Sequence, residues 1–314
     1  MKRVVLSAIL LLASLQSWSQ DSRSAFPFLR LPVSAHVAAL GGDNISIASD
    51  DGTLVFHNPA LASVVSDGSL SLGMMTYMQG CTTASAAYQR YADERGTWGV
   101  NARFISYGEM KRTDVTGQQT GTFSAKDIAV GGTFAYYLAN RLSGGITAKV
   151  VTSYIGDNSS LAAAVDLGLN YNDDEHGWSV SAVARNLGGQ LTAYEDDFER
   201  MPLDLQFGVS KRLMGSPLRF SATLVRLNDW QYGLGKHLVV GADLLLSEQF
   251  YIAAGYNALR ASEMKIASGD GESSHGAALS FGGGIQLERL KLHVAYAKLH
   301  VSSPSLLINF SYTL

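Results

Sequence analysis

The sequence has little cysteine, little proline and little charge. Its 314 residues include one cysteine and six prolines, and 16% of them are charged, compared with about 25% in typical soluble domains. The single cysteine, Cys81, cannot form an internal disulfide and excludes sulfur-rich metal sites. The formal charge of −3 gives no electrostatic reason to bind nucleic acid. No later run approaches the apolar length that a membrane-spanning helix requires, so we predict none.

The first nineteen residues have the pattern of a secretory signal peptide. Lys2 and Arg3 precede an apolar stretch at 4–12, and small residues at 17–19 form a cleavage site before Gln20. The apolar stretch is shorter than the roughly 20 residues of a spanning helix, which argues against a membrane anchor. Without a cysteine at that site, we expect no lipoprotein anchor. Cleavage removes two basic residues, so the formal charge changes from −3 to −5.

Residues 20–68 differ from the rest of the chain and are expected to form a plug. Ser34 can cap a short helix, and Asn58 can cap another that begins at Pro59 and Ala60. The segment is too small to bury a core of its own. We therefore expect it to pack on or inside a larger domain formed by residues 69–314.

Residues 69–314 contain fourteen predicted strands, most of them ten to thirteen residues long. Tilted strands that cross a membrane need about 9–11 residues, more than the usual five or six. We therefore predict an all-β transmembrane barrel of fourteen antiparallel strands. The predicted strands are 69–79, 82–91, 97–107, 125–138, 142–154, 159–171, 177–187, 203–213, 217–227, 238–246, 249–257, 276–287, 290–300 and 304–314.

The strands alternate between an apolar face and a polar face. In the last strand Ile308 and Phe310 share one face, and Asn309 and Ser311 share the other. A barrel in lipid needs the apolar face outside, whereas a soluble barrel needs it inside, and the pattern alone allows both. Taking the first arrangement, we predict charged side chains in the lumen. These are Arg103, Lys149, Asp204, Arg212 and Arg219.

Short and long connections alternate along the chain, which places them at opposite rims of a barrel. The long connections are 108–124, 188–202, 228–237 and 258–275. Outer-membrane barrels have short periplasmic turns and longer external loops. We therefore predict an outer-membrane location with the long loops facing the cell exterior. An even strand number places both barrel ends at the short-turn rim, where we also expect the amino-terminal segment.

No group of residues in the sequence forms a recognisable catalytic or metal site. Seven histidines are scattered, and the acidic run at 195–199 lacks the spacing and glycine of a calcium loop. Ser262 and Lys265 match a serine-x-x-lysine pattern, but no Lys-Thr-Gly partner exists. We therefore predict no enzymatic activity, no cofactor and no bound metal.

A signal peptide followed by a short helical plug and fourteen strands resembles the FadL-like family of fatty-acid transporters. Four segments also resemble the PorQ family of outer-membrane proteins of the type IX secretion system. These segments lie at 26–35, 38–42, 57–61 and 114–127. The chain departs from many outer-membrane barrels at its last residue, Leu314, where an aromatic residue is common.

The PorQ-like resemblance implies a role in a complex that attaches exported cargo to the cell surface. Its implied partners are a PorZ-like surface protein, the PorU sortase, the PorV barrel, and the lipopolysaccharide of the outer membrane. In that role the chain would anchor a partner through its long loops and would not catalyse a reaction. The predicted docking residues are Tyr194, Glu195, Asp196, Asp197, Phe198, Trp230 and Tyr232. The FadL-like resemblance implies an alternative, a channel for small hydrophobic molecules with the plug as a movable hatch.

Overall fold

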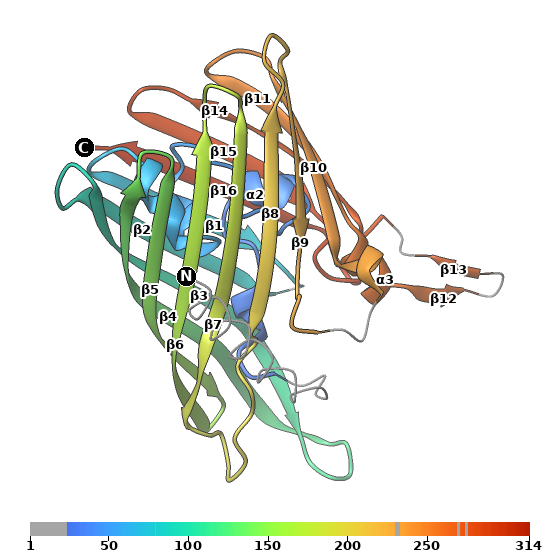
Figure 1. Cartoon of the computed structure of the whole chain (residues 1–314). Coiled ribbons are helices and arrows are strands. Elements are labelled where there is room, and N and C mark those ends of the chain that lie inside the picture. The colour runs from blue at the N-terminus through green and yellow to red at the C-terminus, as the bar shows by residue number, and fades with distance from the viewer. Residues whose placement is uncertain (1–23, 79, 230–232, 269–270, 274–275) are drawn as a thin grey trace.

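A computed structural model shows a closed β-barrel (Figure 1) and describes residues 24–314 except 79, 230–232, 269–270 and 274–275. The predicted signal peptide therefore lies outside the described residues. Fourteen strands close the barrel in the order β1-β16-β15-β14-β11-β10-β9-β8-β7-β6-β5-β4-β3-β2, and every neighbouring pair is antiparallel. The predicted all-β fold with fourteen barrel strands is confirmed. The strands β12 and β13 form a separate hairpin.

The observed barrel strands agree closely in position with the predicted ones. They are β1 (Ser69–Thr76), β2 (Thr82–Tyr91), β3 (Gly96–Thr113), β4 (Gln119–Ala139), β5 (Leu142–Ile155), β6 (Asn158–Asp173), β7 (Trp178–Thr192), β8 (Asp204–Arg212), β9 (Leu218–Leu224), β10 (Leu238–Leu245), β11 (Phe250–Asn257), β14 (Leu279–Gln286), β15 (Leu290–Ala297) and β16 (Ser305–Thr313). Smaller elements lie in two long connections. They are η5 (Leu234–His237), α3 (Ala258–Glu263), β12 (Ile266–Ser268) and β13 (Gly271–Ser273).

The barrel is apolar outside and polar inside. In β16, Ile308 and Phe310 are 42% and 41% exposed, whereas the intervening Asn309 is 1% exposed and Ser311 also 1%. The same alternation holds in β8, where Phe207 is exposed and Gln206 is buried. A soluble barrel would show the reverse arrangement. The arrangement with the apolar face outside is therefore the one that the chain adopts.

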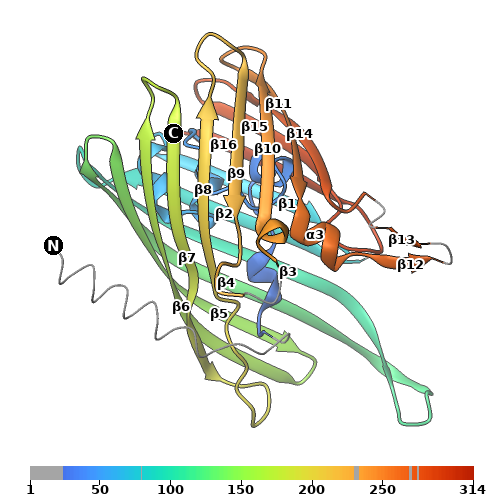
Figure 2. The same ribbon diagram turned by 45° about the vertical axis from the view of Figure 1, so that its right-hand side comes forward.

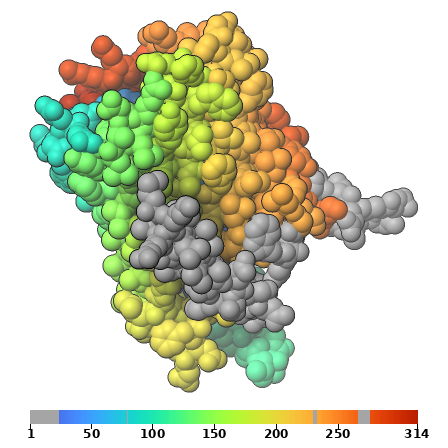
Figure 3. Space-filling model, viewed as in Figure 1, coloured from blue at the N-terminus to red at the C-terminus, as the bar shows by residue number. Residues whose placement is uncertain are grey.

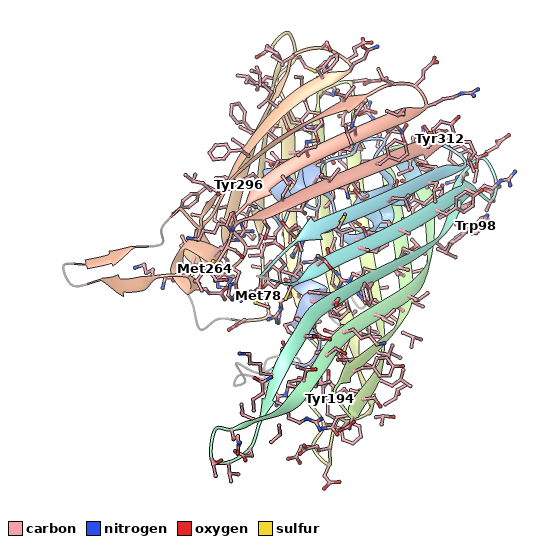
Figure 4. All side chains as sticks on the ribbon, turned by 180° about the vertical axis from the view of Figure 1, so that it is seen from behind. Met78, Trp98, Tyr194, Met264, Tyr296 and Tyr312 are labelled. Carbon is pink, nitrogen blue, oxygen red and sulfur yellow. The ribbon has the colours of Figure 1, made fainter. Side chains whose placement is uncertain are left out.

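Exposed aromatic side chains gather near both ends of the apolar outer face. Trp98 and Tyr312 lie towards one end in Figure 4, and Tyr296 lies away from them on another part of the wall. Aromatic residues at these levels are typical of membrane barrels because their rings prefer the interface between lipid and water. The outer surface thus has the polarity profile of a membrane-spanning wall.

The two rims differ in their connections. Six short turns lie at one rim, joining β2–β3, β4–β5, β6–β7, β8–β9, β10–β11 and β14–β15. The first and last strands also end there, because Ser69 pairs with Thr313. We call this the short-turn rim and the opposite one the long-loop rim. The predicted positions of the two barrel ends are confirmed.

One side of the barrel is much taller than the other. The strands β3 and β4 contain 18 and 21 residues, whereas β9 contains 7 and β10 contains 8. The β3–β4 hairpin, coloured blue-green, projects far beyond the long-loop rim (Figure 2). The prediction of a loop at 108–124 was therefore wrong over most of its length. A bulge between Ser106 and Glu109 bends the ladder there, and strand pairing then continues to Gln119.

The amino-terminal segment lies inside the barrel as a plug. In the view of Figure 3 the wall hides nearly all of its blue surface. Its elements are η2 (Pro27–Arg30), α2 (Ala35–Ala39), η3 (Gly52–Phe56) and η4 (Pro59–Val64). Ser34 caps α2 and Asn58 caps η4, as the sequence predicted. No helix among the described residues is long and apolar enough to span a membrane.

Candidate functional site

The plug passes through the whole lumen, from the long-loop rim to the short-turn rim. At its start, Ser24 forms a parallel bridge with Arg200 of the β7–β8 connection, and the Ala25 amide donates to the Arg200 carbonyl at 2.9 Å. At its end, the carbonyl of Gly68 accepts a hydrogen bond from the Leu314 amide at 3.2 Å. The amino-terminal segment therefore reaches the short-turn rim, as expected, but it also extends to the long-loop rim. The expectation covered only part of its path.

The motif formed by Asn58, Pro59 and Ala60 fixes the plug to the wall. The Asn58 side chain accepts from the Ala60 amide at 3.0 Å and donates to the carbonyls of Ile45 (3.0 Å) and Leu169 (3.4 Å). The wall opposite the motif has no side chains at two positions. A Cβ at Gly168 would lie 2.1 Å from Asn58 Oδ1, and one at Gly145 would lie 2.4 Å from the Ala60 nitrogen. Bare backbone on β5 and β6 thus forms the seat of this motif.

The short-turn end of the plug is also held by charge and hydrogen bonds. Lys291 Nζ of β15 lies 2.5 Å from Asp50 Oδ2, and the Ser66 amide donates to Asp50 at 2.8 Å. From β2, the Gln89 side chain donates to the Gly52 carbonyl at 2.8 Å. These contacts join the last part of the plug to one side of the wall, where β15, β16, β1 and β2 are neighbours.

Three of the predicted lumen charges form buried ion pairs. Lys149 Nζ lies 2.7 Å from Asp166, Asp204 lies 2.7 Å from Arg185, and Arg219 Nε lies 2.8 Å from Asp243. The sequence reasoning did not identify the partners Asp166, Arg185 and Asp243. Their inward position could have been read from the alternation of β6, β7 and β10, but their pairing depends on strand register.

The remaining two predicted lumen charges have other environments. The guanidinium of Arg103 lies over the Phe28 ring of the plug, 4.9 Å from the ring centroid, which is a cation–π contact. Arg212 lies on the inward face of β8 but at its last residue, where the side chain is exposed. It therefore lies on the inward face at the short-turn rim and is not one of the buried charges.

A second buried cluster joins α2 of the plug to the opposite wall. His36 Nε2 lies 2.8 Å from Asp243 Oδ1, and the His36 ring stacks on Tyr251 with centroids 4.1 Å apart. Tyr251 Oη in turn lies 2.7 Å from His293 Nδ1. Because all four side chains are buried, the cluster holds α2 in place and offers no group to solvent. The sequence reasoning treated these histidines as scattered residues.

Two small cavities remain between the plug and the wall. The first lies against β1, β2 and β3, has a free volume of about 20 Å³, and is largely apolar, since its lining includes Phe28, Leu31, Met74, Met75 and Phe104. The second has a free volume of about 20 Å³ and is lined by polar groups that include Arg103, Lys149, Asp166 and Asn186. Each has room for about one water molecule. Neither cavity has room for a molecule much larger than water.

The predicted docking residues belong to two connections, β7–β8 and β9–β10. Glu195, Asp196, Asp197 and Phe198 are exposed at the tip of the β7–β8 connection, and Phe198 is 66% exposed. Tyr194 is half-buried, with its ring centroid 6.3 Å from that of Phe26 in the plug. Figure 4 shows Tyr194 at the far end of the barrel from Trp98. Trp230 and Tyr232 lie outside the described residues.

One group of potential metal ligands lies on the short β6–β7 turn. Asp173, Glu175 and His176 offer atoms within 4.8 Å of one another. Arg141 contacts both carboxylates, at 2.9 Å from Asp173 and 2.5 Å from Glu175. A guanidinium at this position neutralises the carboxylates and opposes a second cation. The group is thus an ion-pair cluster at the rim.

Comparison with known proteins gives a fold and no closer relative. No protein-family model matches the chain, and no curated protein matches it. The toluene transporter TodX of Pseudomonas putida superposes with a TM-score of 0.61 at 11% identity, covering 91% of this chain and 99% of that one. A FadL homologue of Pseudomonas aeruginosa superposes with a TM-score of 0.55 at 10% identity, covering 90% and 99%. The monoaromatic hydrocarbon channel CymD gives 0.58 at 12% identity, covering 91% and 98%. The fold is therefore that of the FadL-like barrels.

Proposed function

We propose that the protein is an outer-membrane channel for small apolar molecules, with the plug as its hatch. The observation that carries this proposal is the first cavity, where apolar plug residues meet the wall formed by β1–β3. It is lined by Phe28 and Leu31 from the plug and by Met74 and Phe104, which belong to the membrane-facing side of the wall. The β1–β3 ladders are paired without a break beside this cavity, so an apolar molecule would pass along the plug within the lumen once the plug moves aside. The names of TodX and CymD, as a toluene transporter and a hydrocarbon channel, support this choice.

The free volume of about 20 Å³ means that transport requires a movement of the plug. The lumen charges do not oppose this mechanism, because Lys149, Asp204 and Arg219 each have a buried partner. The transported molecule would follow the apolar side of the plug and would avoid the polar second cavity. We propose no enzymatic step, cofactor or metal for this function.

Uptake of radiolabelled toluene by cells that carry the full chain tests the channel. We expect faster uptake than in cells without the protein, and a return to that background for Ser85→Phe, which fills the first cavity. The matched control is Ala148→Phe on the exposed outer face of β5, which should leave uptake unchanged. Uptake by the unmodified protein equal to that of cells without it, in both toluene and oleate assays, rules the channel out.

A second candidate function is a surface anchor of the type IX secretion system. The closed lumen favours it, together with the tall β3–β7 side and the exposed tip at residues 195–199. In this role the long-loop rim would face the cell exterior and bind a PorZ-like protein. The PorU sortase, the PorV barrel and lipopolysaccharide would complete the assembly. The closed barrel would then serve as a rigid support.

Cross-linking followed by co-purification distinguishes the anchor from the channel. Replacing residues 195–199 by a glycine–serine linker of equal length should release the partner and leave the barrel folded. The chain with Ser85→Phe should keep the partner. If the variant with the replaced loop captures the same proteins as the native chain, this docking surface is wrong.

A further inference from the structure

The first residues of the plug and the β7–β8 connection form one structural unit. The backbones of Ser24 and Arg200 pair, and the Ala25 amide donates to the Arg200 carbonyl at 2.9 Å. Phe26 and Met201 belong to the same buried hydrophobic cluster, and Tyr194 lies beside the Phe26 ring. A loop at the rim therefore contacts the plug through both backbone and side chains.

The plug backbone is strained at this contact. Phe26 has φ 53° and ψ 51°, the left-handed conformation, and its side chain is 1% exposed. A bulky residue rarely adopts this conformation, because its Cβ approaches the backbone too closely. Such strain persists only where the surrounding contacts hold it. Here the surrounding contacts include the β7–β8 connection.

Two further residues with positive φ form hydrogen bonds near the end of the connection, although one lies within β7 and the other follows β9. Asn186 has φ 61° and its side chain donates to the Pro202 carbonyl at 2.9 Å. Arg226 has φ 50° and its amide donates to Asp204 at 2.9 Å. They are, with Phe26, the three non-glycine residues of the described chain that have positive φ. Of the three, Phe26 alone belongs to the plug, and a bulky residue tolerates positive φ less well than an asparagine does.

The tip of the connection and its base differ in exposure. Its tip at 195–199 is exposed, whereas Asp204 at its base is 3% exposed and pairs with Arg185. Arg185 also reaches Asp43 of the plug at 3.5 Å. The connection thus links an exposed tip to a buried ion pair that also reaches the plug.

We propose that the β7–β8 connection, residues 193–203, is a strap that holds the first part of the plug in a strained closed conformation. Displacing the strap frees residues 24–30 and leaves residues 50–65 seated. Phe28 belongs to the freed part, and it lines the first cavity. This inference rests on the proposed channel function and identifies the part of the plug that moves. A molecule or partner that binds the tip would thereby control the cavity beside β1–β3.

Hydrogen exchange of the full chain in outer-membrane vesicles tests the strap without measuring transport. The variant Tyr194→Ala/Met201→Ala removes the strap's packing but keeps its length. We expect at least tenfold faster exchange at the amides of Leu29 and Leu31, which donate within the first part of the plug. Exchange at residues 52–65 should stay unchanged. The control Phe198→Ala alters an exposed residue of the same connection and should change neither segment.

A reversible cross-link provides the opposite test. Ser24→Cys/Arg200→Cys, in a Cys81→Ser background, places two cysteines at bridged positions. Oxidation should slow exchange at Leu29 about tenfold and abolish toluene uptake, and reduction should restore both. Unchanged exchange in both the strap variant and the cross-linked variant overturns the strap, as does an equal increase over the whole plug. If exchange follows the strap but uptake is absent even in the native chain, the strap stands and the channel function fails.

Discussion

The two ends of the plug are held in the lumen in different ways. At the short-turn end, residues 50–66, the side chains of Asp51 and Asn58 cap the two helices. This end packs against the backbone of Gly145 and Gly168 in the wall. The long-loop end, residues 24–30, begins η2 after Phe26 in a left-handed conformation without a side-chain cap. Regular local structure fixes the first end. The second end is held by the β7–β8 connection together with wall residues that include Arg103, Ile105 and Ala129. The comparison indicates that the plug is anchored at one end and releasable at the other.

The largest expected effect comes from filling the seat of the anchored end. In Gly168→Leu the new side chain must displace Asn58, since a Cβ would already lie 2.1 Å from its Oδ1. We expect a loss of about 3 kcal/mol in the free energy of unfolding, typical of severe overpacking. Urea unfolding of the vesicle-embedded barrel measures it. Gly132→Leu is the matched control, because no atom of the described residues lies within 4 Å of a Cβ there. Equal effects of the two variants would show that the seat is not required.

Removing the charge that ties this end to β15 should have the next largest effect. Asp50→Ala leaves the ammonium of Lys291 buried without its carboxylate, and the Lys291 side chain is only 4% exposed. We expect the free energy of unfolding to fall by about 2 kcal/mol, which is less than for a fully buried pair because Asp50 is partly exposed. The double variant Asp50→Ala/Lys291→Met should recover about half of the loss. A double variant as unstable as the single one contradicts the ion-pair explanation.

Acid should weaken the contact between His57 and residues 33–34, which joins the two ends of the plug, and so lower the free energy of unfolding. His57 Nε2 accepts hydrogen bonds from the Val33 and Ser34 amides at 3.3 Å, so the ring must be neutral on that nitrogen. Burial, and then the charges of Arg185 and Arg103, lower the pKa of His57 well below its usual value. The unfolded chain binds the proton more readily, so stability is complete above about pH 6.5 and falls below it.

The expected loss for His57 is about 1.4 kcal/mol per pH unit below 6.5, until its folded-state pKa is reached. Thermal unfolding at pH 7.5 and 5.5 measures this slope. His57→Gln keeps an acceptor without titrating and should reduce the slope by the share that His57 contributes. An identical slope in both proteins would assign the acid sensitivity to other groups.

The smallest predicted effect concerns the cap of η4. Asn58→Ala removes the acceptor for the Ala60 amide and should cost about 1 kcal/mol. Asn58→Ser can still cap the helix and should lose less. Hydrogen exchange should rise in residues 59–65 and remain constant in residues 24–30. A rise confined to residues 24–30 would reverse the assignment of the anchored and releasable ends.

The alternation of apolar and polar residues along each strand made most of the barrel strands predictable from the sequence. The faces of β16 follow from Ile308, Asn309 and Phe310 alone, because side chains on a strand alternate. The caps at Ser34 and Asn58 are equally local, since each accepts from an amide two or three residues later. The prediction of a loop at 108–124 was wrong because this charged and polar segment has no alternating apolar face to mark it as a strand. Strand pairing beyond the rest of the rim needs no apolar face.

The sequence by itself determined the strand number, the polarity of the two faces, the separation of short and long connections, and the caps of the plug. Each of these depends on residues that are close together in the chain. Only the tertiary structure decided the path of the plug, the contact of His36 with Asp243, and the contact of Phe26 with Tyr194. These depend on barrel closure, which brings residues more than a hundred positions apart together in one lumen. No local pattern specifies such pairings, because they follow from the register of all the strands between them.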